Sequence, residues 1–180
     1  MIPQYAARTR PVLGSPDYPF WYNERASLGS IAAAAWLANG VALEEYSARK
    51  RASRGRADLW ILIDGARFAI EAKQAWLSLG TRARGSPSQL CQRWLSAAKR
   101  DARRLSKEEG FRVGLVCIAP FLPEGEIDHL ESRLRDFCYE VGRIGVGMAW
   151  WFDPIHSPRD DEERRLYPGV LALLARAAND

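Results

Sequence analysis

The sequence has few of the residues from which proteins build disulfide frameworks and metal centres. Its 180 residues include three cysteines, Cys91, Cys117 and Cys138, and two histidines, His129 and His156. An odd number of widely spaced cysteines argues against a disulfide framework and against a zinc knuckle. We therefore expect buried free thiols, and two histidines disfavour a histidine-rich metal site.

Long hydrophobic runs and several common motifs are also absent. No apolar run approaches the ~20 residues of a membrane-spanning helix, and the longest candidate, Ile31–Ala38, stops at Asn39 and Gly40. The first residues lack the basic region and apolar stretch of a secretory signal. The phosphate-loop and Gly-x-Ser-x-Gly patterns do not occur. These absences predict a cytoplasmic protein with no membrane partner.

What the sequence does contain is enough apolar material for one domain of the α/β class. Hydrophobic residues make up 47% of the chain, which supports a sizeable core at this length. We expect an irregular arm over 1–22, a core over 23–119 and an extension over 120–180. The predicted elements are a helix over 24–38, strands over 41–48, 57–63 and 66–73, a helix over 88–107, a strand over 111–119, a helix over 126–140, a strand over 143–152 and a helix over 167–178.

Positive charge is concentrated in two stretches. Residues 49–56 hold five basic side chains and no acid, and residues 82–107 hold eight against Asp101 alone. The acidic residues gather over 124–140 and 160–163. Such segregation is typical of a face that binds a polyanion. The alternative is a solvated basic helix, and charge alone does not separate the two.

A predicted β-hairpin gathers three charged side chains. If Asp64 and Gly65 form a two-residue turn, Asp58 lies opposite Glu71, with their alpha carbons about 4.5–5.5 Å apart. Lys73 points to the same side of the sheet, because it lies two residues beyond Glu71. Opposed carboxylates repel, and a bound divalent cation would offset the repulsion. The alternative is an ordinary salt bridge to Lys73.

A third carboxylate belongs to the first predicted helix, which Asn23 can cap. Glu24 shares one helical face with Leu28, Ile31 and Ala35, so it continues an apolar stripe and is expected to point toward the sheet. The alternative is an acid in the first turn that is favoured by the helix dipole.

The order Asp58, then Glu71-Ala72-Lys73 on the next strand, resembles the signature of the PD-(D/E)XK nuclease superfamily. The order of elements from Glu24 to residue 119 also resembles its core of helix, three strands, helix and strand. Ala57 stands where that signature has proline. The helix after Lys73 has glutamines but lacks the tyrosine of the RecB-type branch.

This resemblance implies a restriction endonuclease-like core with a mixed central sheet, extended at the C-terminus by a helix, a strand and a helix. It also implies hydrolysis of DNA or RNA that depends on Mg²⁺ or Mn²⁺. Asp58, Glu71 and the backbone carbonyl of Ala72 would ligate the metal, and Glu24 would hold a metal-bound water or a second ion. Lys73 would position or deprotonate the attacking water and stabilise charge on the phosphate.

The expected partner is nucleic acid, with DNA favoured, and the basic stretches are predicted to flank the carboxylates and form a groove. The residues expected to contact nucleic acid are Arg49, Lys50, Arg51, Arg54, Arg56, Arg82, Arg84, Gln89, Gln92 and Arg93. Two other functions stay open. One is a nucleic-acid-binding module that does not cut. The other is an assembly domain in which an edge strand containing Trp150–Phe152 pairs with a partner subunit or a second copy.

Overall fold

The computed structural model describes residues 17–49, 54–153, 159–160 and 163–178. Its helices are η1 (Pro19–Trp21), α2 (Glu24–Leu37), α3 (Pro87–Ala102), η2 (Lys107–Glu109), η3 (Glu124–His129) and α4 (Leu130–Gly142). Its strands are β1 (Val41–Arg49), β2 (Arg54–Ile63), β3 (Ala66–Ser78), β4 (Phe111–Pro123), β5 (Gly147–Phe152), β6 (Arg159–Asp160), β7 (Arg165–Leu166) and β8 (Gly169–Arg176).

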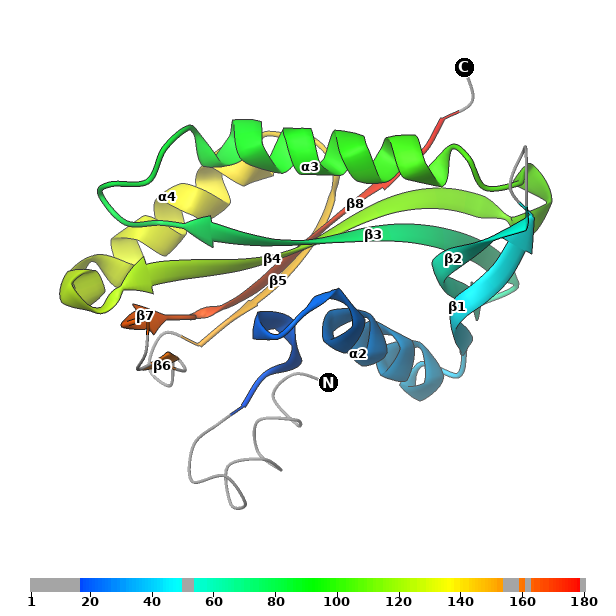
Figure 1. The fold of residues 1–180 in the computed structure, drawn as a ribbon, viewed down its shortest axis with the longest axis horizontal. Coiled ribbons are helices and arrows are strands. Elements are labelled where there is room, and N and C mark those ends of the chain that lie inside the picture. The colour runs from blue at the N-terminus through cyan, green and yellow to red at the C-terminus, as the bar shows by residue number, and fades with distance from the viewer. Residues whose placement is uncertain (1–16, 50–53, 154–158, 161–162, 179–180) are drawn as a thin grey trace.

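A mixed sheet forms the centre of the molecule. The strands β1, β2 and β3 are antiparallel neighbours, β4 runs parallel to β3, and β8 and then β5 continue the sheet antiparallel to β4. The short strands β7 and β6 add to the end of β4. Figure 1 shows α3 and α4 on one face of the sheet and α2 on the other. The predicted α/β class and the order helix, three strands, helix, strand are confirmed.

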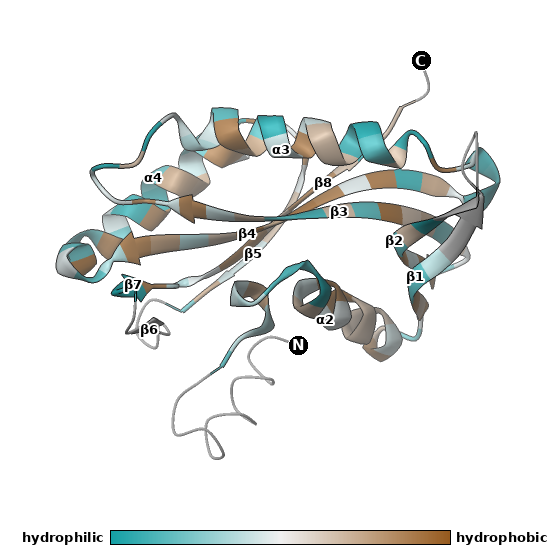
Figure 2. Cartoon of the chain, in the orientation of Figure 1, coloured by the Kyte–Doolittle hydropathy of each residue, from teal (hydrophilic) through white to brown (hydrophobic). Residues whose placement is uncertain are grey.

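Each face of the sheet has its own hydrophobic core. Leu95 of α3 and Phe137 of α4 pack against Ile118 on one face, whereas Leu28 of α2 packs near Leu115 on the other. Strand β4 contributes to both cores because alternate residues point to opposite faces. Figure 2 shows hydrophobic colours over much of β4, with more hydrophilic residues near its start. The site-bearing strand β3 therefore lies beside a strand that is buried on both faces.

Helix α3 lies unusually close to the sheet at one glycine. A Cβ atom added at Gly114 of β4 would lie 2.5 Å from the backbone nitrogen of Lys99. Any side chain at position 114 would therefore push the helix away. The close approach fixes the last turns of α3 over the start of β4 and the neighbouring part of β3.

The largest difference from the sequence prediction concerns the C-terminus. Residues 167–178 do not form a helix, because residues 169–176 form strand β8. This strand lies between β4 and β5 and pairs with both. Leucine and alanine favour helices, but a strand buried between two partners also reads as a continuous apolar run. The predicted C-terminal helix is therefore wrong.

Other predicted boundaries also shift. The helix expected to reach Lys107 ends at Ala102, and the helix expected over 126–140 is α4, preceded by the 3-10 turn η3. The end of the predicted irregular arm is not loose, because Tyr18 and Phe20 are buried and contact Trp151. Residues 1–16 lie outside the described part of the chain. None of the helices among the described residues is long and apolar enough to cross a membrane.

Candidate functional site at the free edge of strand β3

The predicted hairpin is confirmed in both its turn and its register. Asp64 and Gly65 have φ values of 48° and 74°, as a type I′ turn requires at both central positions. Five pairs follow the turn in the predicted register, from Ile63 opposite Ala66 to Leu59 opposite Ile70. Local turn chemistry therefore sets the relative positions of β2 and β3.

The ladder ends one step before the predicted carboxylate pair. The described pairing of β2 with β3 stops at Leu59, and the pairing of β1 with β2 omits Glu45 and Asp58. Glu45 also has a φ of 50°, which is uncommon outside glycine. Strand β1 is thus distorted at Glu45, Asp58 of β2 is left out of both ladders, and the direct pairing of Asp58 with Glu71 predicted from the register does not form.

Strand β3 continues to Ser78 without β2 beside it, and we call residues 71–78 its free edge. Asp58 lies at the start of this edge, where its Oδ2 accepts a hydrogen bond of 2.7 Å from the backbone N–H of Ala72. Glu24 accepts a hydrogen bond from the backbone N–H of Gln74. The two carboxylates therefore take the place of the carbonyl groups that a neighbouring strand would supply.

The pKa of Glu24 is shifted by burial and by the charges of neighbouring side chains. Burial raises its pKa above the ordinary value, and the negative charge of Asp58 raises it further. The positive charge of Lys73 and the N–H of Gln74 act in the opposite direction without cancelling the increase. Glu24, Asp58 and Lys73 therefore share one electrostatic environment, and the prediction that Glu24 points toward the sheet is confirmed.

Lys73 forms an ion pair that the sequence prediction did not include. Its Nζ lies 3.1 Å from Oδ2 of Asp101, in the last turn of α3. Burial lowers the pKa of Lys73, but the hydrogen bond and charge of Asp101 outweigh it, with help from Glu24 and Asp58, so the pKa is raised. Lys73 is therefore protonated at neutral pH. The predicted alternative was a salt bridge from Lys73 to a carboxylate of the hairpin, but the salt bridge that forms is to Asp101 of α3.

Glu71 occupies a different position from the other two carboxylates. It is buried, with 6% of its surface exposed, and it lies next to Gly114 of β4. Strand alternation turns it toward α3, on the same side as Ala69 and Lys73. Among the described residues, no group of three or more His, Cys, Asp or Glu side chains is arranged to hold a metal ion.

The oxygen atoms at the free edge nevertheless fit a hard cation. Both backbone groups of a strand residue point to the same neighbour, so the N–H bond to Asp58 indicates that the Ala72 carbonyl also faces this edge. Carboxylate, carbonyl and water oxygens are the ligands that Mg²⁺ takes, and it needs only one or two carboxylates. Glu24, Asp58 and the Ala72 carbonyl form such a set.

Gln74 holds the start of α2 against this edge. Its Oε1 accepts a hydrogen bond of 2.9 Å from Ser27, and its Nε2 donates one of 2.7 Å to the Phe20 carbonyl. Asn23 caps the helix through the backbone N–H of Ala26. Apart from its place directly after Lys73, no pattern in the sequence indicated this role of Gln74.

The described residues expected to contact nucleic acid come from β2, from the loop after β3 and from α3. Arg56 of β2 is exposed and pairs with Glu45 at 3.0 Å, and Glu45 also pairs with Arg25 at 2.7 Å. The loop after β3 and the exposed face of α3 carry Arg82, Arg84, Gln89, Gln92 and Arg93. Lys50 and Arg51, and the side chains of Arg49 and Arg54, lie outside the described residues. The predicted groove stays a prediction.

The cysteines have no part in this site. Burial raises the pKa of Cys91 to about 12, and the same cause raises that of Cys117 to about 12. Thiols with such values are protonated and unreactive. The expectation of buried free thiols is confirmed for these two residues, and Cys138 is half-buried.

No protein-family model matches this chain, and no match was found among curated proteins or solved structures.

Proposed function

We propose that this protein is a metal-dependent nuclease with a restriction endonuclease-like core. The observation that carries the proposal is the convergence of Glu24 and Asp58 on the free edge of β3, beside Lys73. These residues come from a helix and two strands, and their order along the chain is that of the PD-(D/E)XK signature.

The two neighbouring carboxylates at this edge, Glu24 and Asp58, favour a cation as the ligand. Burial raises the pKa of Glu24, and the Asp58 carboxylate raises it further, because a nearby like charge makes the ionised form of Glu24 costlier. A divalent cation would remove that cost. Glu24, Asp58 and the Ala72 carbonyl would hold Mg²⁺ or Mn²⁺, with Glu71 as the further ligand that the resemblance implies. When bound, the metal would lower the pKa of its water and neutralise charge on the phosphate.

Protonated Lys73 suits one of its two predicted roles. Its raised pKa makes it a poor proton acceptor at neutral pH, and it supports a role as a fixed positive charge near the scissile phosphate. Asp101 then acts as a positioning residue, because its carboxylate holds the ammonium group of Lys73. We therefore assign charge stabilisation to Lys73.

A cleavage assay tests the proposal. Labelled DNA and RNA strands are incubated with wild-type protein in Mg²⁺, in Mn²⁺ and in a chelator. We expect cleavage only with metal, and we expect Asp58→Asn and Lys73→Gln to lower the rate by more than the roughly 10- to 100-fold typical of indirect partners. Asp128→Asn, an exposed acid of η3, is the matched control. Metal-independent cleavage, or full activity in Asp58→Asn, would contradict the proposal.

A binding module that does not cut is the second candidate. It is favoured by the hydrogen bonds that the backbone N–H groups already give to Asp58 and Glu24, because these carboxylates then have a structural role without metal. In this case wild-type protein binds nucleic acid in chelator, with an affinity that falls steeply as salt rises, and cuts neither DNA nor RNA.

A further inference from the structure

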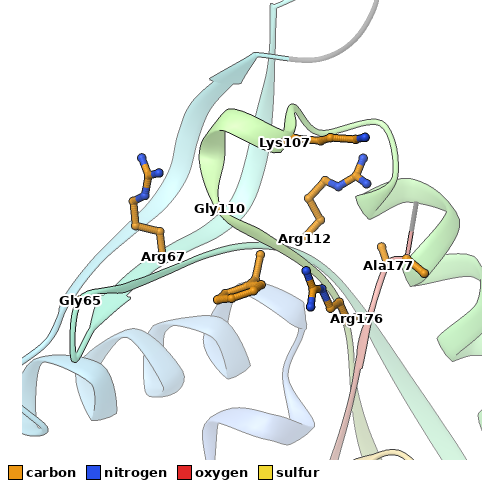
Figure 3. Close-up of a pocket in the computed structure, with 9 residues that line it drawn as sticks. Gly65, Arg67, Lys107, Gly110, Arg112, Arg176 and Ala177 are labelled. Atoms are coloured by element: carbon orange, nitrogen blue, oxygen red, sulfur yellow. The ribbon is translucent and has the colours of Figure 1, made fainter. Parts of the chain in front are cut away.

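A second charged region lies at the opposite end of β3 from the free edge. A cavity of about 680 Å³ is lined there by the β2–β3 turn, by η2 and by the ends of three strands. Figure 3 shows the four cationic side chains that line it. They are Arg67 of β3, Lys107 of η2, Arg112 of β4 and Arg176 of β8. We call these four residues the cationic pocket.

The described lining of the cavity carries charge of one sign only. The described residues that line the cavity comprise four cations, three glycine or aromatic residues and two alanines, with no carboxylate among them. Neighbouring positive charges repel unless an anion lies between them. Arg112 already has partners within the protein, so Arg67, Lys107 and Arg176 are the cations that a multiply charged anion would neutralise.

Arg112 is the fixed member of the set. Only 6% of it is exposed, and its Nη1 donates to the backbone carbonyls of Arg103 at 3.0 Å and Leu105 at 3.3 Å. These carbonyls follow the end of α3, where the helix dipole favours positive charge. The guanidinium group is therefore held in place before any ligand arrives, which lowers the entropic cost of binding.

The walls of the pocket are also held in place. Gly110 has a φ of 113°, and a Cβ atom added there would lie 2.3 Å from the Arg67 carbonyl. The guanidinium group of Arg176 lies 4.7 Å from the centre of the Phe111 ring, a cation–π contact. The backbone of Arg67 therefore packs against Gly110, and the guanidinium group of Arg176 packs against Phe111, so both arginines are held beside the start of β4.

We propose that the cationic pocket binds a phosphate-bearing polyanion. Guanidinium groups donate paired hydrogen bonds to phosphate oxygens, and the cavity volume lies in the range of small-ligand sites. It exceeds what one phosphate group needs and has room for two linked phosphates. The phosphate could belong to a free diphosphate compound or to the 5′ end of a nucleic acid strand, and the two share this chemistry.

This site is separate from the free edge of β3. Arg67 precedes Lys73 by six residues, which is about 20 Å along a strand. The inference therefore does not depend on the proposed metal site, and its test is carried out in chelator. Asp58→Asn protein, measured in parallel, is expected to bind as the wild type does, so that the two proposals fail independently.

Titration with inorganic pyrophosphate at constant ionic strength tests the proposal by calorimetry. We expect saturable binding by the wild type, weakened about tenfold or more in the double variant Arg67→Gln/Lys107→Gln. Both side chains are exposed, and the single variants replace the double if it fails to fold. The control double variant, Arg135→Gln/Arg143→Gln, removes two exposed charges around α4 and is expected to bind like the wild type.

A second arm identifies the source of the phosphate. Single-stranded DNA with a 5′-phosphate is compared with the same strand ending in a 5′-hydroxyl group. A preference for the phosphorylated strand that disappears in Arg67→Gln/Lys107→Gln assigns the pocket to strand ends, and pyrophosphate binding without this preference assigns it to a free compound. No saturable binding of either probe, or equal binding by the wild type and the double variant, would overturn the proposal.

Discussion

The two ends of β3 carry charges of opposite sign, and the same helix supports both. At the free edge, Asp101 of α3 holds Lys73 beside two carboxylates. At the cationic pocket, the carbonyl groups just after α3 hold Arg112. Two carboxylates lie at the free edge with Lys73 beside them, whereas the described lining of the cationic pocket has no acidic residue. Strand β3 thus separates the proposed metal site from the proposed anion site, and α3 supports both.

Displacing α3 from the sheet is expected to have the largest effect on stability and on both proposed functions. In Gly114→Ala, the new Cβ atom would lie 2.5 Å from the Lys99 nitrogen, so α3 has to shift. We expect a loss of about 1–3 kcal/mol in the free energy of unfolding, typical of overpacking, and a loss of both metal-dependent cleavage and pyrophosphate binding. Denaturant unfolding measures the first effect.

Gly125→Ala is the matched control for this substitution, because nothing lies within 4 Å of a Cβ atom added at position 125. It is expected to remain close to wild type in stability. Equal stability of Gly114→Ala and Gly125→Ala would show that α3 does not press on β4. If Gly114→Ala loses only metal-dependent cleavage or only pyrophosphate binding, α3 does not support both regions.

A smaller and more selective effect is expected from Asp101→Asn. The charge and hydrogen bond of Asp101 raise the pKa of Lys73, so this substitution lowers that pKa. We expect cleavage to fall by about 10- to 100-fold and the alkaline limb of its pH profile to move to lower pH. Asp101→Glu is expected to restore part of both, and pyrophosphate binding is expected not to change. If the alkaline limb does not move, Asp101 does not act on catalysis through the pKa of Lys73.

The smallest expected effect concerns stability without metal. Because the folded pKa of Glu24 is raised above 4.5, the folded protein holds this proton more tightly than the unfolded chain does. The resulting destabilisation is fully present above the folded pKa and disappears as the pH falls below 4.5. Relative to Glu24→Gln, the wild type is therefore expected to gain about 0.2–1 kcal/mol as the pH falls through this window.

Thermal unfolding in chelator between pH 7 and pH 4 measures this difference. Glu126→Gln provides a comparison of opposite sign, because the Thr81 backbone N–H lowers the pKa of Glu126. The contribution of Glu126 to stability is present above 4.5 and is lost as the pH falls through its lowered pKa. The same pH slope in both variants would contradict the raised pKa that burial and the charge of Asp58 give to Glu24.

Much of the fold around the site was predictable from local patterns. The Asp64-Gly65 turn fixes the register of the hairpin through turn geometry alone, and the apolar stripe on α2 places Glu24 toward the sheet. Strand β8 was missed because its leucine- and alanine-rich run suits a buried strand and a buried helix equally. Only its pairing with both β4 and β5 decides between them.

The details of the candidate site were less accessible. The register placed Asp58 opposite Glu71, but the ladder between β2 and β3 ends before that pair, and the neighbouring strand β1 is distorted at Glu45. Asp101 lies 28 residues after Lys73 in the sequence, and only the packing of α3 on Gly114 brings them together. The cationic pocket joins residues of four separate elements, so no local pattern indicated it.

The most direct test of the central claim is a Mn²⁺ titration of the metal-free protein, followed by electron paramagnetic resonance. Saturable binding is expected for the wild type and for the exposed-acid control Asp128→Asn. Binding is expected to be at least about tenfold weaker in Glu24→Gln and in Asp58→Asn, since each variant removes one carboxylate ligand. Equal Mn²⁺ affinity in all four proteins, or no binding by the wild type, would contradict a metal site at the free edge of β3.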